Sequence, residues 1–183
     1  MTKYIVFLAD IQVAQVGKLR QAITDAVNDG ATELYLAISS GGGSVVEGLA
    51  IAALLRGLPV EVTTHNIGQT DSVANVIFAA GKKRYATANA SFLFHGVTQP
   101  FLNNPTLTEP QVLESYKTIV RARESIALNF STYTGMALLD VTSLMVDGAT
   151  ILPATEALKK TIIHGIQDLN IPKGAQIVTI GNA

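Results

Sequence analysis

The sequence predicts an α/β fold built on a mostly parallel sheet, and this prediction rests on two kinds of segment and on the order in which they follow one another. Short apolar segments rich in β-branched side chains alternate with segments whose apolar residues recur at helical spacing. This alternation is typical of a parallel sheet that is covered by helices. No internal repeat or linker-like tract interrupts the 183 residues, so we expect one domain over residues 1–183.

The predicted strands and helices follow one another along the chain. Strand-like runs cover residues 4–8, 33–39, 60–66, 83–85, 91–94 and 162–166. Helical patterns cover residues 16–27, 44–56, 72–80, 109–133, 138–145 and 155–160. Capping-box patterns at Ser44 and Thr108 mark two of the helix starts. Residues 176–180 are also strand-like, but the sequence does not indicate their place in the sheet.

The longest predicted helix covers about residues 109–133. At roughly 1.5 Å per residue it would extend about 37 Å, which is longer than the sheet of a small domain. We therefore expect this helix to project and to pack against another subunit.

Composition and charge exclude several classes of partner. The chain has 13 basic and 14 acidic side chains without a basic stripe, so we do not expect nucleic acid as a partner. Hydrophobic residues make up 48% of the chain and mean hydropathy is +0.34, yet no apolar run approaches the ~20 residues that span a bilayer. We therefore expect no membrane partner and interpret the apolar excess as subunit interfaces. The first residues lack the features of a signal peptide, so we expect a cytoplasmic location.

The chain offers few residues that could hold a metal or cofactor. It contains no cysteine, which excludes disulfides and thiolate metal sites. Its three histidines, His65, His95 and His164, lack metal-ligand spacing. We expect no metal and no other cofactor.

Three segments that follow predicted strands carry residues suited to catalysis: a glycine run at 41–43, Ser72 and His95. The carboxyl ends of parallel strands meet at one edge of a sheet, so we expect these segments to lie close together. A serine at a strand-to-helix turn exposes its hydroxyl beside backbone N–H groups that favour negative charge. Each feature also has a purely structural interpretation, because serine is a common N-cap residue and glycine serves tight turns.

Five short segments in a fixed order carry a resemblance to a known family. They are S-G-G-G-S-V at 40–45, G-Q-T-D-S-V-A-N at 68–75, A-G-K-K-R at 80–84, A-N-A-S-F-L-F-H at 88–95 and Y-T-G-M-A at 133–137. From about Tyr4 to Ile166 the chain resembles the proteolytic subunit of Clp proteases, serine peptidases with the ClpP/crotonase fold. This resemblance implies repeated β-β-α and βαβ units, with residues 109–133 as the projecting "handle" helix. Gly41 replaces the usual proline of the family, and Asp71 replaces an alanine.

The resemblance implies a serine-type endopeptidase that acts on short peptides or unfolded chains through an acyl-enzyme. Ser72 would be the nucleophile, His95 the general base, and the N–H groups of Gly43 and Val73 the oxyanion hole.

The acid of the family's Ser-His-Asp triad has no clear counterpart. Counting back from Glu156 places Ala149 at its position, whereas counting forward from Gly135 places Gly148 there. Asp147 is adjacent and is our candidate for the third member. Either a loop shift brings Asp147 to His95, or the acid is missing, in which case activity is low or absent.

The resemblance also implies a homo-oligomer, in the form of a heptameric ring or of stacked rings. Clp proteolytic subunits carry a segment before the first strand that helps to engage an unfoldase, whereas this chain begins almost at that strand. We therefore expect it to act without a Clp ATPase. Two alternatives stay open: a catalytically impaired scaffold subunit of a ClpP-like ring, and a crotonase-type acyl-thioester enzyme.

Overall fold

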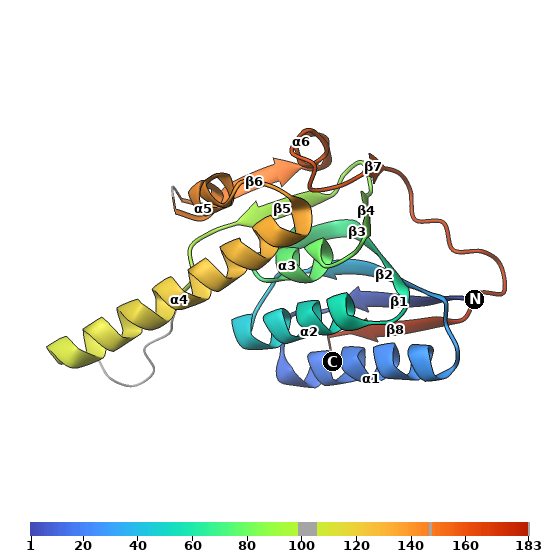
Figure 1. Ribbon diagram of the computed structural model, residues 1–183, viewed down its shortest axis with the longest axis horizontal. Coiled ribbons are helices and arrows are strands. Elements are labelled where there is room, and N and C mark those ends of the chain that lie inside the picture. The colour runs from blue at the N-terminus through green and yellow to red at the C-terminus, as the bar shows by residue number, and fades with distance from the viewer. Residues whose placement is uncertain (99–105, 147, 183) are drawn as a thin grey trace.

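An eight-stranded sheet forms the centre of the computed structural model, which describes residues 1–98, 106–146 and 148–182 (Figure 1). The strands are β1 (Thr2–Leu8), β2 (Glu33–Ser40), β3 (Glu61–Asp71), β4 (Lys83–Ala86), β5 (Ser91–Phe94), β6 (Thr150–Pro153), β7 (Gly165–Ile166) and β8 (Ile177–Gly181). The helices are α1 (Val13–Asn28), α2 (Val45–Gly57), α3 (Ala74–Ala79), α4 (Glu109–Thr134), α5 (Leu138–Val146) and α6 (Ala154–Lys159).

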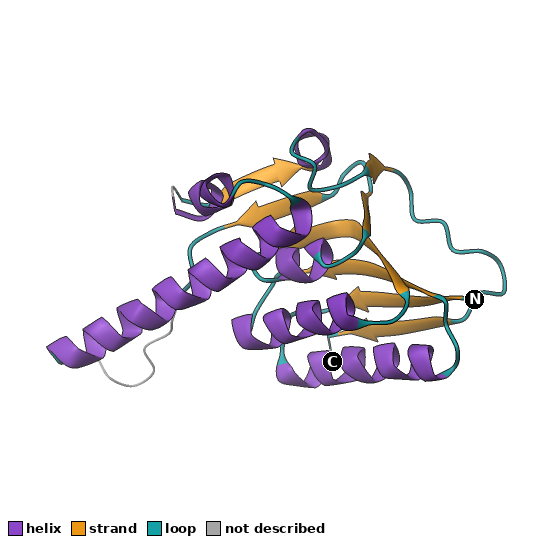
Figure 2. Cartoon of the chain, viewed as in Figure 1, coloured by secondary structure: helices purple, strands orange, loops and turns teal. Residues whose placement is uncertain are grey.

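The sheet is mostly parallel, as the alternation of strands and helices predicts. Its main path runs β6-β5-β3-β2-β1-β8, while β4 pairs with the first half of β3 and with β7. Among the described strands, β5 and β6 form the antiparallel pair and the other pairs are parallel. The predicted α/β class is therefore confirmed (Figure 2). None of the described helices is both long and apolar enough to cross a membrane.

One face of the sheet packs against helices, and the side chains between them form the hydrophobic core. Alternate residues of β2, including Leu34 and Leu36, are fully buried on this face. Two edge-to-face aromatic pairs join the helices to β5: Phe78 to Phe92, with ring centroids 5.1 Å apart, and Phe130 to Phe94, at 5.2 Å. This packing fixes the position of β5, the strand that precedes His95.

The other face of the sheet carries a row of rings. His65 of β3 lies between Tyr35 and Tyr85, with ring centroids 6.0 and 6.2 Å away. Its Nε2 lies 3.1 Å from the carbonyl oxygen of Gln167, and its Nδ1 lies 2.8 Å from the Tyr35 hydroxyl. Because a carbonyl oxygen only accepts, Nε2 carries the proton and Nδ1 accepts from Tyr35. His65 thus binds the segment after β7 to the sheet through the Gln167 carbonyl.

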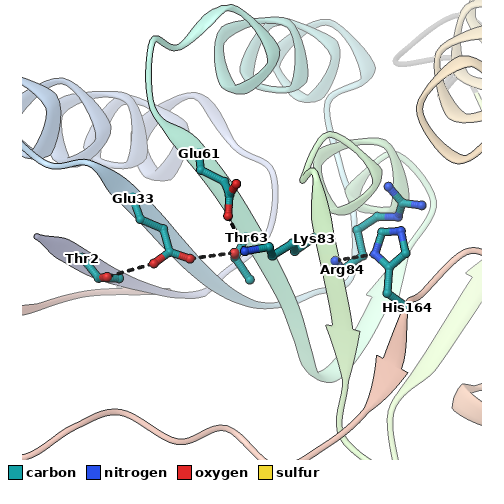
Figure 3. A network of polar contacts seen from close by, with 7 residues as sticks. All are labelled: Thr2, Glu33, Glu61, Thr63, Lys83, Arg84 and His164. Carbon is teal, nitrogen blue, oxygen red and sulfur yellow. Dashed lines mark hydrogen bonds and ion pairs between the residues drawn. The ribbon is translucent and has the colours of Figure 1, made fainter.

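A polar network occupies the amino ends of the strands (Figure 3). The Glu33 carboxylate accepts hydrogen bonds from the hydroxyls of Thr2 and Thr63, at 2.9 and 3.0 Å. Next to it, Lys83 Nζ and Glu61 Oε1 form an ion pair at 2.5 Å. These groups lie at the end of the sheet opposite to the predicted catalytic residues, so the network fixes strand starts.

The third strand is longer than predicted. It continues to Asp71 instead of ending at Asn66, and its pairing with β2 shifts register between Ile38 and Ser40. The Gly68 N–H donates to Asn66 Oδ1 at 3.1 Å. The residues directly after Asn66, which we expected to leave the strand, therefore form a bulge inside it.

The C-terminal strands also differ from the prediction. The strand predicted over 162–166 contains only Gly165 and Ile166, because the N–H groups of Ile162 and Ile163 donate to the Ala157 carbonyl at the end of α6. The strand-like segment of the tail is β8, which pairs in parallel with β1 at the sheet edge.

The long helix α4 runs from Glu109 to Thr134, close to its predicted bounds. At its start the Thr108 N–H donates to Gln111 Oε1 at 2.9 Å, and at its end Gly135 adopts a left-handed conformation with φ 81°. Its buried residues lie in its last third, and its first half projects away from the sheet (Figure 1).

Candidate active site

Ser72 occupies a tight turn between β3 and α3. Its φ of 55° lies in the left-handed region, which costs a non-glycine residue about 1–3 kcal/mol. The Ser72 N–H donates to the Leu93 carbonyl at 2.8 Å, and the Ser72 carbonyl accepts from Asn75 N–H at 3.1 Å. These two bonds hold a half-buried serine at the carboxyl end of the sheet, where a strained backbone indicates a functional constraint.

The glycine run packs directly against this turn. Gly42 has a φ of 87°, and a Cβ added there would lie 2.7 Å from the Asp71 carbonyl oxygen and 2.9 Å from Ser72 Cβ. Gly43 has a φ of 141°, and a Cβ on it would lie 2.5 Å from the Ile11 carbonyl oxygen. Both positions therefore need glycine. Their contacts bring the 41–43 loop and Ser72 together, as the sequence predicts.

The backbone N–H groups of Gly43 and Val73 make no hydrogen bond within the described residues. The parallel bridge between Ile11 and Gly43 leaves the Gly43 N–H outside its two bonds, which are Ile11 N–H to the Gly42 carbonyl and Ser44 N–H to the Ile11 carbonyl. Val73 is fully buried at the start of α3, where N–H groups lack intrahelical partners. Two N–H groups near Ser72 thus have no partner in the described part of the chain: that of Val73, the next residue, and that of Gly43, which follows the Gly42 packed against Ser72.

His95 follows β5 and is half-buried. Its Nδ1 lies 2.6 Å from the Gly96 carbonyl oxygen, so Nδ1 carries a proton and Nε2 is left able to accept one. The bond from Ser72 N–H to Leu93 places the serine beside the strand that carries His95. Within the described residues, no hydrogen bond joins the Ser72 hydroxyl to His95. The two side chains therefore belong to adjacent strand ends, with no hydrogen bond between them in the described part of the chain.

The predicted third member, Asp147, lies outside the described residues. Strands β5 and β6 pair Phe94 with Thr150 in antiparallel register. The next residues along the two strands are His95 and Ala149, so this register favours Ala149 over Gly148 as the position opposite His95.

Asp71 is a described carboxylate at the end of β3, directly before Ser72. It pairs with Leu93 in the parallel register of β3 and β5, so its side chain shares a face with Leu93 and His95. Burial raises the pKa of the Asp71 carboxyl above its ordinary value, against smaller opposing effects of a hydrogen bond from the Leu93 backbone and of the His95 charge. The sequence marks Asp71 as a departure from the family pattern but does not indicate this position.

A cavity of about 600 Å³ lies among segments that follow the glycine run and His95 in the chain. It lies between the start of α2, which follows the glycine run, the segment after His95, and α4. Its lining is mostly apolar and comprises Val45, Val46, Leu49, Val97, Thr98, Thr118, Ile119, Arg121, Ala122 and Ser125. Sequence analysis missed this cavity, because its walls come from three segments that are distant in the chain. Among the described residues, no group of three or more His, Asp or Glu side chains is arranged to hold a metal ion.

Comparisons with known proteins identify the family of the chain. The family model described as Clp protease matches residues 3–169. Relatives named ATP-dependent Clp protease proteolytic subunit include one from Illicium oligandrum, 31% identical over 79% of this chain and 68% of the relative, and one from Drimys granadensis, 30% identical over the same shares. A subunit 1 of that name from Leifsonia xyli subsp. xyli is 38% identical over 38% of this chain and 36% of its own length.

A solved structure shares the fold. A point mutant of ClpP1 from Listeria monocytogenes superimposes with a TM-score of 0.81 over 91% of this chain and 92% of its own, at 18% sequence identity. The chain therefore belongs to the Clp protease family and has the ClpP-like fold.

Proposed function

We propose that this protein is a serine peptidase that cleaves short peptides or unfolded chains, with Ser72 as nucleophile. The observation that carries the proposal is the strained Ser72 turn, flanked by the unpaired N–H groups of Gly43 and Val73. A serine hydroxyl beside backbone N–H groups that have no partner among the described residues is an arrangement suited to acyl transfer.

The proposed reaction has two steps. Ser72 Oγ attacks the peptide carbonyl carbon while His95 Nε2 takes the hydroxyl proton, and the Gly43 and Val73 N–H groups stabilise the oxyanion. His95 then gives this proton to the leaving amine, which leaves an acyl group on Ser72. Water then attacks the acyl carbon while His95 Nε2 takes its proton, and the ester bond breaks as this proton passes to Ser72 Oγ, which releases the acid and restores the serine. The contact between Nδ1 and the Gly96 carbonyl supports this role, because it leaves Nε2 free to act as base.

We propose that the cavity between the start of α2, α4 and the segment after His95 takes an apolar side chain of the substrate. Its lining residues Val45 and Val97 each lie two positions after the proposed groups, Val45 after Gly43 and Val97 after His95. A side chain bound there would present its own carbonyl carbon between the oxyanion donors and His95.

We further propose that the chain acts as one domain in a homo-oligomer that works without a Clp ATPase. A ring, heptameric as is typical of the family, would pack the projecting half of α4 against other subunits. The support is that Val112, Leu113 and Tyr116 are 52%, 50% and 64% exposed on that half.

A second candidate function is that of a catalytically impaired scaffold subunit. The observation that favours it is the β5–β6 register, which puts Ala149 opposite His95 where the family has its acid. Loss of the orienting acid can lower turnover by about 10⁴.

Hydrolysis of fluorogenic peptides tests the proposal and separates these candidates. We expect Ser72→Ala to abolish hydrolysis and His95→Ala to lower it by about 10²–10⁴. If the acid is missing, Ala149→Asp should raise turnover at least about tenfold while Asp147→Ala changes nothing; if Asp147 serves, its replacement should lower turnover instead. Wild-type protein of confirmed assembly that cleaves no peptide would favour the scaffold function.

A further inference from the structure

The C-terminal strand β8 ends beside the loop that carries the proposed oxyanion donor. It pairs in parallel with β1 over five residues, from Tyr4 opposite Ile177 to Leu8 opposite Gly181. Parallel pairing brings the carboxyl ends of both strands to the edge of the sheet where Ser72 and the glycine run lie. This strand also lies outside residues 3–169, which the family model matches.

One hydrogen bond extends this pairing into the loop between β1 and α1. The Asp10 N–H donates to the Asn182 side-chain Oδ1 at 3.0 Å. Asp10 in turn lies against the glycine run, since a Cβ added to Gly41 would be 3.2 Å from Asp10 Oδ1. Asn182 therefore binds the backbone of Asp10, and Asp10 itself lies against the glycine run.

The next residue, Ile11, fixes Gly43 directly. The Ile11 N–H donates to the Gly42 carbonyl at 2.7 Å, and the Ile11 carbonyl accepts from Ser44 N–H at 2.8 Å. The Ile11 side chain is fully buried, and the 2.5 Å approach of its carbonyl oxygen to a Cβ built on Gly43 leaves no free space between them. A displacement of the Asp10–Ile11 backbone must therefore move Gly43 as well.

We infer that Asn182 is a positioning residue, which acts through Asp10 and Ile11 to hold the Gly43 N–H at the oxyanion position. The inference rests on the proposed function of Ser72 and adds a role for the C-terminal strand. A donor stabilises the developing charge only when it lies within hydrogen-bond distance of the oxyanion, and misplacement by about 1 Å can cost 10²-fold in rate. Loss of one exposed contact permits a smaller shift, so we expect an effect of about tenfold.

The test measures the rate at which a fluorophosphonate probe labels Ser72 in the full-length protein. We expect Asn182→Ala to lower the labelling rate about tenfold and Asn182→Asp, which keeps the acceptor oxygen, to stay within about twofold of wild type. The pH midpoint of the labelling rate should not move, because the change leaves Ser72 and His95 untouched. A matched control is Asn170→Ala, which removes an exposed asparagine between β7 and β8. Equal rates for wild type and Asn182→Ala would overturn the inference, as would a loss that Asn182→Asp does not rescue.

Hydrogen exchange gives a second readout that does not depend on activity. We expect faster exchange at the Ile11 and Ser44 amides in Asn182→Ala, but not in Asn182→Asp or Asn170→Ala. Unchanged exchange would show that the contacts of Asn182 do not hold the loop, even if Ser72 reacts normally. If wild-type Ser72 takes no label while exchange responds as expected, the proposed function fails, and the catalytic role of Asn182 fails with it.

Discussion

At the residue scale, glycine positions decide whether the serine turn can form. Gly42 brings the glycine run at 41–43 within van der Waals contact of Ser72 and Asp71, and its φ of 87° excludes most side chains. The left-handed Ser72 and the glycines opposite it therefore form one packed unit. The left-handed conformation of Ser72 is held by its backbone hydrogen bonds and by the packing of Gly42 against it.

Replacement of Gly42 by alanine should disrupt this unit. The added methyl group would overlap the Asp71 carbonyl oxygen, so we expect the free energy of unfolding to fall by about 1–3 kcal/mol and probe labelling of Ser72 to fall at least about tenfold. Urea denaturation and labelling kinetics measure the two effects.

Gly17→Ala provides the matched control for this change. Gly17 lies inside α1 with no atom within 4 Å of an added Cβ. The same substitution there should raise the free energy of unfolding by about 0.5–1 kcal/mol and leave labelling unchanged. If Gly42→Ala also leaves labelling unchanged and does not lower the free energy of unfolding, the close packing of Gly42 against Ser72 and Asp71 is wrong.

At the element scale, the sequence predicts the segments that have strong local signals. The bounds of α4 follow from its capping box and from Gly135, and β5 falls where its apolar run predicts. The extension of β3 could not be predicted, because Gly68 signals a turn locally while pairing with β2 and β5 keeps the strand extended. The place of β8 depends on its pairing with β1 at the other end of the chain, which no local pattern records.

The candidate site was predictable to the same extent. Ser72, His95 and the glycine run each follow a strand, so their meeting at one edge follows from parallel topology. The register of β6 against β5 was not predictable, since it depends on the path of the connection from α5. For that reason the sequence leaves Ala149 and Gly148 as alternatives for the position of the family's triad acid.

The row of rings formed by Tyr35, His65 and Tyr85 predicts a pH dependence of stability. Burial lowers the pKa of His65 below its ordinary value of 6.5, against smaller opposing effects of the Gln167 carbonyl and the Asp168 charge. The unfolded chain therefore binds a proton more readily than the folded one, and this part of the stability is present above about pH 6.5 and lost as the pH falls below it. We expect the urea midpoint of unfolding to decrease between about pH 7 and about pH 5.

Substitution of His65 separates its share of this dependence. His65→Gln should flatten the decrease, because the side chain no longer gains a charge. His164, whose pKa is also lowered by burial and by the Arg84 charge, should account for part of the rest, so the double variant should flatten it further. A His65→Gln profile parallel to that of wild type would contradict the interpretation of the ring row.

At the scale of the whole molecule, the projecting half of α4 should determine assembly. The exposed apolar residues Val112, Leu113 and Tyr116 belong to the half of α4 that extends away from the sheet (Figure 1). We expect Leu113→Glu together with Tyr116→Glu to shift the protein to smaller species in size-exclusion chromatography with light scattering. Glu114→Gln, on the same half of the helix, should leave the mass unchanged. Equal masses for the double variant and wild type would show that subunits associate elsewhere.

The central claim is that Ser72 is an activated nucleophile, and intact-mass analysis after incubation with a fluorophosphonate tests it most directly. We expect one label per chain, located at Ser72 by peptide mapping, absent in Ser72→Ala and much slower to form in His95→Ala. An assembled wild-type protein that takes up no label, or a Ser72→Ala variant that is labelled as fast as wild type, would contradict it.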